Sequence, residues 1–304
     1  MSLTRELLKR VLPRRWVASV RLAKSIGPRL DALEKQSLLL NAYIAREAYP
    51  HLMPVTPDAA AFNRHEIKVY SQNGEDGLIL NLFSTIGVRN RYFVEFGCGN
   101  GSECNTANLS VNFGWRGLLL DADDARIAQA RAFYERMLGP RAGNVRIANT
   151  RVTAENINDT LRRQVPEREI DLLSIDIDGN DYWVWRAIEA VEPRAVVIEY
   201  NSVFGPERAL TVKYDPEFRR WAKHPSGLYF GASLAALVKL GRAKGYRLIG
   251  CDRQGVNAFF IPDHVDGFPE VPPETAYLPN NDRVLGLVTP DRFREIEHLP
   301  FVEV

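Results

Sequence analysis

Residues 93–103 read FVEFGCGNGSE and carry three alternating glycines, Gly97, Gly99 and Gly101, with Glu95 two residues before the first. The apolar run 92–96 leads into them and predicts a short buried strand. A glycine loop after a first strand exposes backbone N–H groups at the start of a helix, a common place for nucleotide-like ligands. The stretch therefore predicts an α/β fold with a ligand loop after its first strand.

The spacing of the glycines narrows the choice of ligand. A phosphate-binding P-loop needs GxxxxGK[ST], and no Lys-Ser/Thr pair follows these glycines. A dinucleotide fingerprint, GxGxxG, would place its third glycine at Ser102. The observed ExGxGxG spacing suits S-adenosylmethionine, which has no pyrophosphate. Glu95 would accept its ammonium group, and residues 97–101, Cys98 included, would lie under the sulfonium and ribose.

A carboxylate at the end of the next predicted strand supports an adenosine ligand. The segment GLLLD ends in Asp121, twenty residues after Gly101, and Asp123 lies just behind it. An acid at this position can accept hydrogen bonds from both ribose hydroxyls. Since NAD proteins use the same device, Asp121 predicts an adenosine ribose without choosing between the cofactors.

Strand and helix patterns alternate through the middle of the chain. Strands are predicted at 92–96, 117–120, 144–148, 171–175 and 194–200, and helices at 71–86, 105–111, 125–138, 154–163, 181–190 and 231–245. This alternation predicts a parallel sheet covered on both faces. Strands 246–251 and 256–261 are joined by four residues, too few for a parallel crossover, so they form an antiparallel hairpin. Five parallel strands and a terminal antiparallel hairpin make a doubly wound seven-stranded α/β sheet, similar to that of class I methyltransferases.

The length and the net charge of the chain limit the domain organisation and the partners that can be expected. Its 304 residues suffice for one large core with appendages, and a net charge of +1 gives no argument for nucleic acid as a partner. We predict a helical N-terminal extension and linker at 1–65, the main domain at 66–262 and a C-terminal extension packed on it at 263–304. Three cysteines without a CxxC motif favour reduced thiols in a cytoplasmic protein. No apolar stretch is long enough for a membrane span, and no signal peptide is recognised.

The N-terminal extension concentrates the basic charge. Ten lysines and arginines against four acids give residues 1–50 a net charge of +6. Residues 1–25 are amphipathic, and two interpretations stay open: a helix on the anionic inner membrane face, or an arm packed on protein with its basic side in solvent. Residues 29–48 have a short heptad-like seam, which predicts a helix that either forms a homodimer or packs on the main domain.

Several motifs carry a resemblance to a known family. They are SQNGEDG (71–77), EFGCGNGSECNT (95–106), GWRGLLLDAD (114–123), LLSIDIDGNDYWVW (172–185), VIEYN (197–201), YFGASLAAL (229–237) and KGYRLIGCDRQGVNAFF (244–260). Over residues 66–262 the chain resembles the FkbM-type S-adenosylmethionine-dependent methyltransferases. The resemblance implies O-methylation of sugars or of natural-product hydroxyls, commonly in polysaccharide biosynthesis. It also implies that Gln72 and Glu75 reach the cofactor.

Polar side chains end the fourth and fifth predicted strands. Asp176 and Asp178 follow one, Glu199 and Asn201 the other, and neighbouring strand ends place them together. Three roles are open: all four bind Mg²⁺; Asp178, with Asp176 beside it, is a general base; or the acids fix the loop and Asp176 binds the cofactor. His224, in the long insert 202–230, is either another candidate base or a surface histidine.

Aromatic and basic residues around the insert bear on the acceptor. The aromatics either stack on sugar rings or belong to the core: Tyr182, Trp183, Trp185, Phe204, Tyr214, Phe218, Trp221, Tyr229 and Phe230. The basic residues either meet an anionic acceptor or face solvent: Arg208, Lys213, Arg219, Arg220 and Lys223. We predict a cytoplasmic enzyme, peripheral to the inner membrane in one interpretation, that methylates a hydroxyl of a saccharide or lipid-linked glycan. The alternatives are a small natural product as acceptor, or a non-catalytic cofactor-binding scaffold in glycan assembly.

Overall fold

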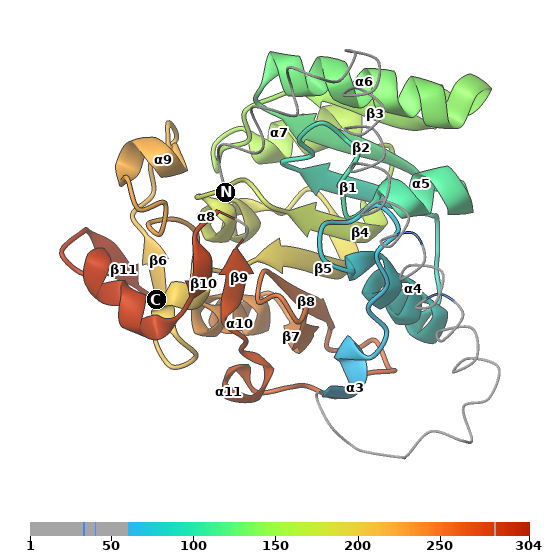
Figure 1. Ribbon diagram of the computed structural model, residues 1–304. Coiled ribbons are helices and arrows are strands. Elements are labelled where there is room, and N and C mark those ends of the chain that lie inside the picture. Colours follow the sequence, from blue (N-terminus) through green and yellow to red (C-terminus); the bar gives the residue numbers. More distant parts are fainter. Residues whose placement is uncertain (1–32, 34–39, 41–59, 283) are drawn as a thin grey trace, which may run out of the picture. The chain divides into compact units, whose positions relative to one another are not determined.

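The structure is a computed structural model that describes residues 33, 40, 60–282 and 284–304 (Figure 1). The chain divides into two compact units, Met1–Val55 and Thr56–Val304. The helices predicted at 1–25 and 29–48 lie outside the described residues, except Leu33 and Leu40, which are helical and exposed. Membrane contact and dimerisation through these segments therefore stay predictions. Among the described helices, none combines the length and the apolar character that crossing a membrane requires.

A seven-stranded sheet forms the centre of the second unit, with strand order β3-β2-β1-β4-β5-β8-β7 (Figure 1). Its strands are β1 (Tyr92–Phe96), β2 (Arg116–Asp121), β3 (Val145–Asn149), β4 (Glu169–Ile175), β5 (Glu192–Glu199), β7 (Tyr246–Cys251) and β8 (Asn257–Pro262). The pairs from β3 to β5 are parallel, whereas β8 runs antiparallel to both β5 and β7. The predicted five parallel strands and terminal hairpin are confirmed.

Helices cover both faces of this sheet because its strands are apolar on both sides. Along β1, Phe93 packs toward one face, while Val94 and Phe96 pack toward the other, as the two-residue period of a strand requires. The Phe93 face is covered by α4 (Glu75–Ile86), α5 (Ala107–Phe113) and α6 (Asp124–Leu138), and the opposite face by α7 (Ile157–Gln164), α8 (Asp181–Ala187) and α10 (Leu234–Ala243). The doubly wound arrangement is therefore confirmed.

The insert after β5 and the C-terminal segment pack on each other. The insert contains β6 (Leu210–Val212) and α9 (Arg220–Lys223), and the C-terminal segment contains α11 (Pro273–Ala276), β9 (Asn280–Asp282), β10 (Gly286–Val288) and β11 (Phe301–Glu303). Strand β11 pairs antiparallel with β6, and β9 pairs with β10 (Figure 1). A third apolar cluster, which includes Phe204, Phe230, Val288 and Ile296, joins the two segments.

The end of the predicted linker is structured. Helix α3 (Ala60–Asn63) lies within the span 51–65, where the sequence showed little periodicity. Phe62 is buried, and its ring centroid lies 5.1 Å from that of Phe259 and 5.8 Å from that of Phe268. One aromatic anchor therefore holds this short helix on the sheet, although so short a segment carries no periodic signal.

Candidate active site

A cavity of about 520 Å³ lies at the carboxyl ends of the central parallel strands. Nine residues predicted for cofactor or catalysis line it: Gln72, Glu75, Glu95, Gly97, Cys98, Gly99, Asp121, Asp176 and Asp178. Cavities of this size hold small ligands, and parallel sheets place them at this edge. The remaining candidates, Gly101, Asp123, Glu199, Asn201 and His224, do not line it.

The three glycines of the loop have different physical roles. Gly97 has φ 76°, and a Cβ there would lie 1.6 Å from the backbone oxygen of Asp176, so no larger residue fits. Gly99 has φ 54° and lines the cavity with open space where a Cβ would point. At Gly101 a Cβ would lie 3.0 Å from that of Ala130, so this glycine lets α6 approach the loop rather than touching a ligand.

Asp121 ties the glycine loop to the loop after β2. Its Oδ2 accepts a hydrogen bond from the Gly99 N–H at 2.8 Å, and its Oδ1 accepts one from the Asp123 N–H at 2.9 Å. The side chain is 8% exposed and lines the cavity. Each carboxylate oxygen has a second lone pair, so Asp121 retains two acceptor sites for ligand hydroxyls.

Glu95 is buried beneath the glycine loop and holds the start of α5. Its Oε1 accepts a hydrogen bond from the Asn105 N–H at 2.9 Å. Its Oε2 accepts hydrogen bonds from the Thr106 N–H at 3.1 Å and from the Thr106 hydroxyl at 2.5 Å. Burial raises the pKa of Glu95 to about 6, although these hydrogen bonds oppose that shift. Glu95 thus both lines the cavity and positions its wall, a role that the sequence did not indicate.

The loop before α4 is folded around two acids. Glu75 accepts from the N–H groups of Asn73 (2.8 Å) and Gly74 (3.0 Å) and from the Asn257 amide (3.0 Å). Asp76 accepts from three successive backbone N–H groups at 69–71. This compact loop brings Gln72 to the cavity wall beside Glu75. Contact of these two side chains with the cofactor stays a prediction.

Two predicted site residues make structural contacts within the fold. Asp123 caps α6, accepting from the N–H groups of Ala125 (2.8 Å) and Arg126 (3.0 Å). Asn201 is buried, and its amide donates to the backbone oxygens of Leu228 (2.7 Å) and Phe230 (2.9 Å).

His224, predicted as a candidate base, lies away from both pockets of the site. Its Nδ1 lies 2.8 Å from the Ser226 hydroxyl, and its ring packs near His298. His224 borders neither the 520 Å³ cavity, hereafter the large cavity, nor a smaller pocket of about 270 Å³ beside Asp176 and Asp178. These contacts are set by the folded insert, so the sequence alone could not reveal them.

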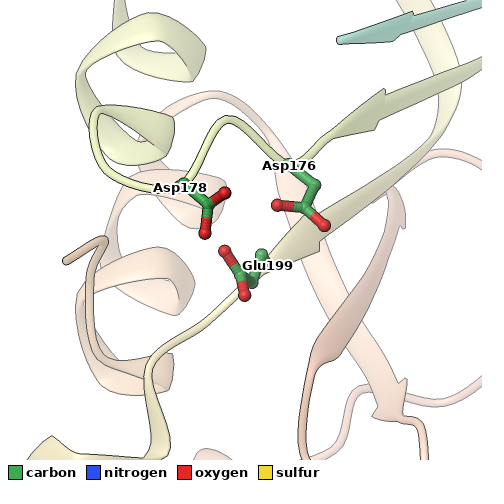
Figure 2. A group of neighbouring side chains, drawn as sticks. All are labelled: Asp176, Asp178 and Glu199. Carbon is green, nitrogen blue, oxygen red and sulfur yellow. The ribbon is translucent and has the colours of Figure 1, made fainter. Parts of the chain in front are cut away.

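Asp176, Asp178 and Glu199 form a cluster at the ends of β4 and β5, with their carboxylates turned toward one another (Figure 2). One oxygen from each lies within 4.8 Å of the others. Glu199 is buried and Asp176 is half-buried, and their desolvation, strengthened by the neighbouring acids, raises the pKa of both. Asp178 has φ 57°, an uncommon conformation that turns the loop between β4 and α8.

One arginine partly balances this negative charge. Arg220 of α9 donates from Nη1 to Asp178 Oδ1 at 2.9 Å and from Nε to the Gly227 oxygen at 2.7 Å. Its guanidinium also lies 3.7 Å from the centre of the Phe230 ring. Of the five basic residues that the sequence offered for an acceptor, Arg220 is the one that lines a pocket beside the cluster.

A second pocket, of about 270 Å³, lies on the other side of the cluster. It shares Gln72, Asp176, Asp178 and Val256 with the large cavity, and Glu199, Arg220, Asn73, Asn280, Asn281 and Val284 complete its lining. The carboxylates therefore lie where two neighbouring pockets meet. Asn280 and Asn281 belong to the C-terminal segment, and no sequence signal marked them.

Most aromatic candidates are core residues. Six of the nine are buried, namely Tyr182, Trp185, Phe204, Phe218, Tyr229 and Phe230. Trp221, next to Arg220 on α9, is 55% exposed and packs over Gly227, where a Cβ would come within 2.6 Å of its ring. Phe218, although buried, is the one of these nine that lines the large cavity, whereas Trp221 lines neither pocket of the site.

Sequence reasoning also missed polar residues of the large cavity. Arg126 and Gln129 reach it from α6, and Thr150 and Arg151 follow β3. The last two could have been found, because residues after a parallel strand lie at the ligand edge.

The sheet order and the antiparallel β8–β7 pair define an α/β fold of the class I methyltransferase type. No family model and no curated protein matches the chain. Membership of the FkbM-type family therefore stays a prediction.

Solved structures similar to the chain include several methyltransferases. The CcbJ methyltransferase from Streptomyces caelestis is 14% identical, with a TM-score of 0.40 over 63% of this chain and 90% of that one. An O-methyltransferase from Bacillus cereus, in complex with SAH, is 15% identical, with a TM-score of 0.39 over 72% and 95%. A SAM-dependent methyltransferase from Thiobacillus denitrificans, in complex with S-adenosyl-L-homocysteine, is 13% identical, with a TM-score of 0.34 over 65% and 73%. Identities and TM-scores this low carry no inference about function.

Proposed function

We propose that the chain is an S-adenosylmethionine-dependent O-methyltransferase that acts on a hydroxyl of a saccharide. The observation that carries this proposal is the cavity at the strand ends, where the open face of Gly99, the two remaining acceptor sites of Asp121 and the acids after β4 come together. When bound, S-adenosylmethionine supplies an electrophilic methyl group. Asp121 would accept its ribose hydroxyls, and Glu75 and Glu95 supply negative charge for its ammonium group.

The carboxylate cluster is suited to the acceptor half of the reaction. The acceptor oxygen attacks the methyl carbon, an O–C bond forms, and the S–C bond breaks with its electron pair left on sulfur. The hydroxyl proton must leave during this step, and Asp176 and Asp178 lie at the junction of the two pockets. Holding the acceptor in line contributes most of the rate gain in such a transfer. A carboxylate of the cluster would accept this proton directly; alternatively, the three acids would hold Mg²⁺, which would lower the pKa of the acceptor hydroxyl.

The lining of the smaller pocket favours a saccharide acceptor. Amide side chains from Gln72, Asn73, Asn280 and Asn281 gather there beside the acids and Arg220. Such groups both donate and accept hydrogen bonds, as a ring with several hydroxyls requires. The Phe218 ring, which lines the neighbouring cavity, offers an apolar surface beside these polar groups.

Two further proposals concern the N-terminal extension and the cellular location of the enzyme. We propose a cytoplasmic enzyme whose basic residues 1–25 contact anionic lipid of the inner membrane face and whose residues 29–48 join two chains. Sedimentation with phosphatidylserine vesicles at low and high salt tests the first, and light scattering tests the second. Salt-insensitive sedimentation would contradict the lipid proposal, and a monomeric mass would contradict the dimer.

Calorimetry tests the cofactor directly. The purified chain is titrated with S-adenosylmethionine, S-adenosylhomocysteine and NAD⁺. We expect the two adenosyl ligands to bind and NAD⁺ to bind far more weakly. Binding of NAD⁺ alone, or of none of the three, would contradict the methyltransferase proposal.

Transfer of a labelled methyl group tests the acceptor. The enzyme is incubated with labelled S-adenosylmethionine and, in separate reactions, sugar nucleotides, lipid-linked oligosaccharides and small phenolic natural products. Label in the first two classes supports a saccharide acceptor, whereas label only in the phenols would replace it with a natural product. Cofactor binding without turnover on any class, in cells as well as with purified components, would favour a non-catalytic scaffold.

A further inference from the structure

We propose that Asp176, Asp178 and Glu199 form a binding site for one hard divalent cation, Mg²⁺ or Mn²⁺, between the cofactor cavity and the acceptor pocket. The role of this cation in activating an acceptor rests on the proposed function. Its binding does not, because the site is defined by its own three side chains.

The geometry of the three carboxylates suits a shared ion. One oxygen from each lies within 4.8 Å of the others, and Figure 2 shows that they converge from the end of β5 and from the loop after β4. Oxygen ligands lie about 2.0–2.1 Å from Mg²⁺ in an octahedron, so adjacent ligands are about 3 Å apart and opposite ligands about 4 Å. An inward movement of these side chains by no more than about 2 Å would therefore satisfy the ion without rearranging the strands.

A second observation points to an absent ligand. Glu199 is only 6% exposed, and its Oε2 has no hydrogen-bond partner among residues 60–282 and 284–304. An enclosed carboxylate oxygen without a partner is unfavourable, because it has lost water and gained nothing in return. The other carboxylates of this region are satisfied differently. Asp181, for example, accepts from the backbone N–H groups of Ile177 (2.8 Å) and Gly179 (2.9 Å).

Local charge leads to the same conclusion. Among the described residues that line the smaller pocket, Arg220 is the positively charged one, and its Nη1 lies 2.9 Å from Asp178 Oδ1. Asp176 and Glu199 add two further carboxylates to a cluster whose negative charge the Arg220–Asp178 ion pair balances only in part. Such a pair must either share a proton or hold a metal ion, and the third carboxylate, Asp178, favours the ion.

The site is also open on the sides where a reaction would need it. Mg²⁺ keeps several of its six positions for water or substrate, and these would face the polar pockets that Asp176 and Asp178 both line. A hydroxyl bound there would lose its proton more readily and would be fixed toward the cofactor cavity. Sugars with adjacent hydroxyls can supply two such oxygens at once.

Manganese binding provides the direct test. The full chain is treated with a chelator, and Mn²⁺ is titrated while its free-ion electron paramagnetic resonance signal is recorded. We expect one Mn²⁺ per chain, displaced by excess Mg²⁺. Glu199→Gln and Asp176→Asn should each weaken binding by at least about tenfold, since each removes one charged ligand. The matched control is Asp159→Asn, an exposed acid of α7 paired with Arg162, which should bind Mn²⁺ as the unaltered chain does.

The outcomes separate this inference from the proposed function. S-adenosylhomocysteine binding is measured on the same samples, and thermal melts show that each variant is folded. Cofactor binding with no Mn²⁺ binding, or Mn²⁺ binding unchanged in both ligand variants, would overturn the metal site and leave a shared proton as its replacement. Mn²⁺ binding without adenosyl-ligand binding would retain the metal site and overturn the proposed function.

Discussion

Two acids, two residues apart, should differ in how the same substitution affects cofactor binding. Asp121 lines the cavity and accepts the Gly99 N–H at 2.8 Å and the Asp123 N–H at 2.9 Å. Asp123 lies outside the cavity and caps α6. Asp121→Ala should therefore weaken cofactor binding, whereas Asp123→Ala should affect stability alone.

The magnitudes follow from these contacts. A hydrogen bond to a charged group contributes about 1.5–3 kcal/mol, so losing two from Asp121 should lower the free energy of unfolding by about 3 kcal/mol once water replaces part of the loss. Losing the two ribose hydrogen bonds should cost about 1.5–3 kcal/mol of binding, or roughly a 10- to 100-fold rise in Kd. Removing the Asp123 cap should cost about 1 kcal/mol of stability and leave Kd unchanged.

Calorimetry with S-adenosylhomocysteine and urea unfolding measure both quantities on the same preparations. Asp121→Asn serves as the conservative variant, because it keeps the volume and one acceptor oxygen, and an intermediate Kd is expected. If both alanine variants raised Kd equally, cofactor binding would depend on loop stability rather than on a ribose contact. If folded Asp121→Ala bound as the unaltered chain does, the ribose assignment would be wrong.

Three further predictions test other parts of the structure. Gly97→Ala should lower the free energy of unfolding by at least about 3 kcal/mol, because its Cβ would lie 1.6 Å from the Asp176 backbone oxygen. The control is Gly87→Ala, which has a similar φ of 72° but no atom within 4 Å of its Cβ, and it should cost about 1 kcal/mol. Urea unfolding measures both variants. Burial raises the pKa of Glu66 from 4.5 to about 7, so the native state holds this proton more tightly than the unfolded state. The contribution of Glu66 to the free energy of unfolding should therefore decline by about 3 kcal/mol as the pH rises from 4.5 to about 7. In urea unfolding, Glu66→Gln should not show this decline, and identical pH profiles for the variant and the unaltered chain would contradict the prediction. His224→Gln should leave initial rates of methyl transfer within about twofold, because its ring borders neither pocket; a large loss would restore it as a base.

The residues that could be predicted from the sequence are those fixed by local pattern. Asp121 was found because it ends a buried apolar strand and because acids at such ends meet ribose. The glycine loop followed from its spacing, and the terminal hairpin from a connection too short for a crossover. These signals lie within a few residues of one another, so no knowledge of distant contacts was needed.

The roles of other residues could not be predicted from the sequence, because they depend on contacts between distant segments. Asn201 looked like a metal ligand, but its amide is occupied by the backbone at 228 and 230, which only the folded insert brings near. Asn280 and Asn281 reach the smaller pocket from a three-residue strand, too short to show a period. Gly101 matched the glycine motif, yet its conformation serves the packing of α6.

The pairing of β6 with β11 has a consequence for protein engineering. The walls of the smaller pocket combine Arg220 from the insert with Asn280 and Asn281 from the C-terminal segment, and β6–β11 and one apolar cluster hold these segments together. Transplanting the insert alone into a related scaffold would leave β6 an unpaired edge and would leave Phe204 without the rings of Phe293 and Phe301 on which it packs. Insert and C-terminal segment therefore form a single exchangeable cassette, and libraries that seek new acceptors should recombine the two as one unit.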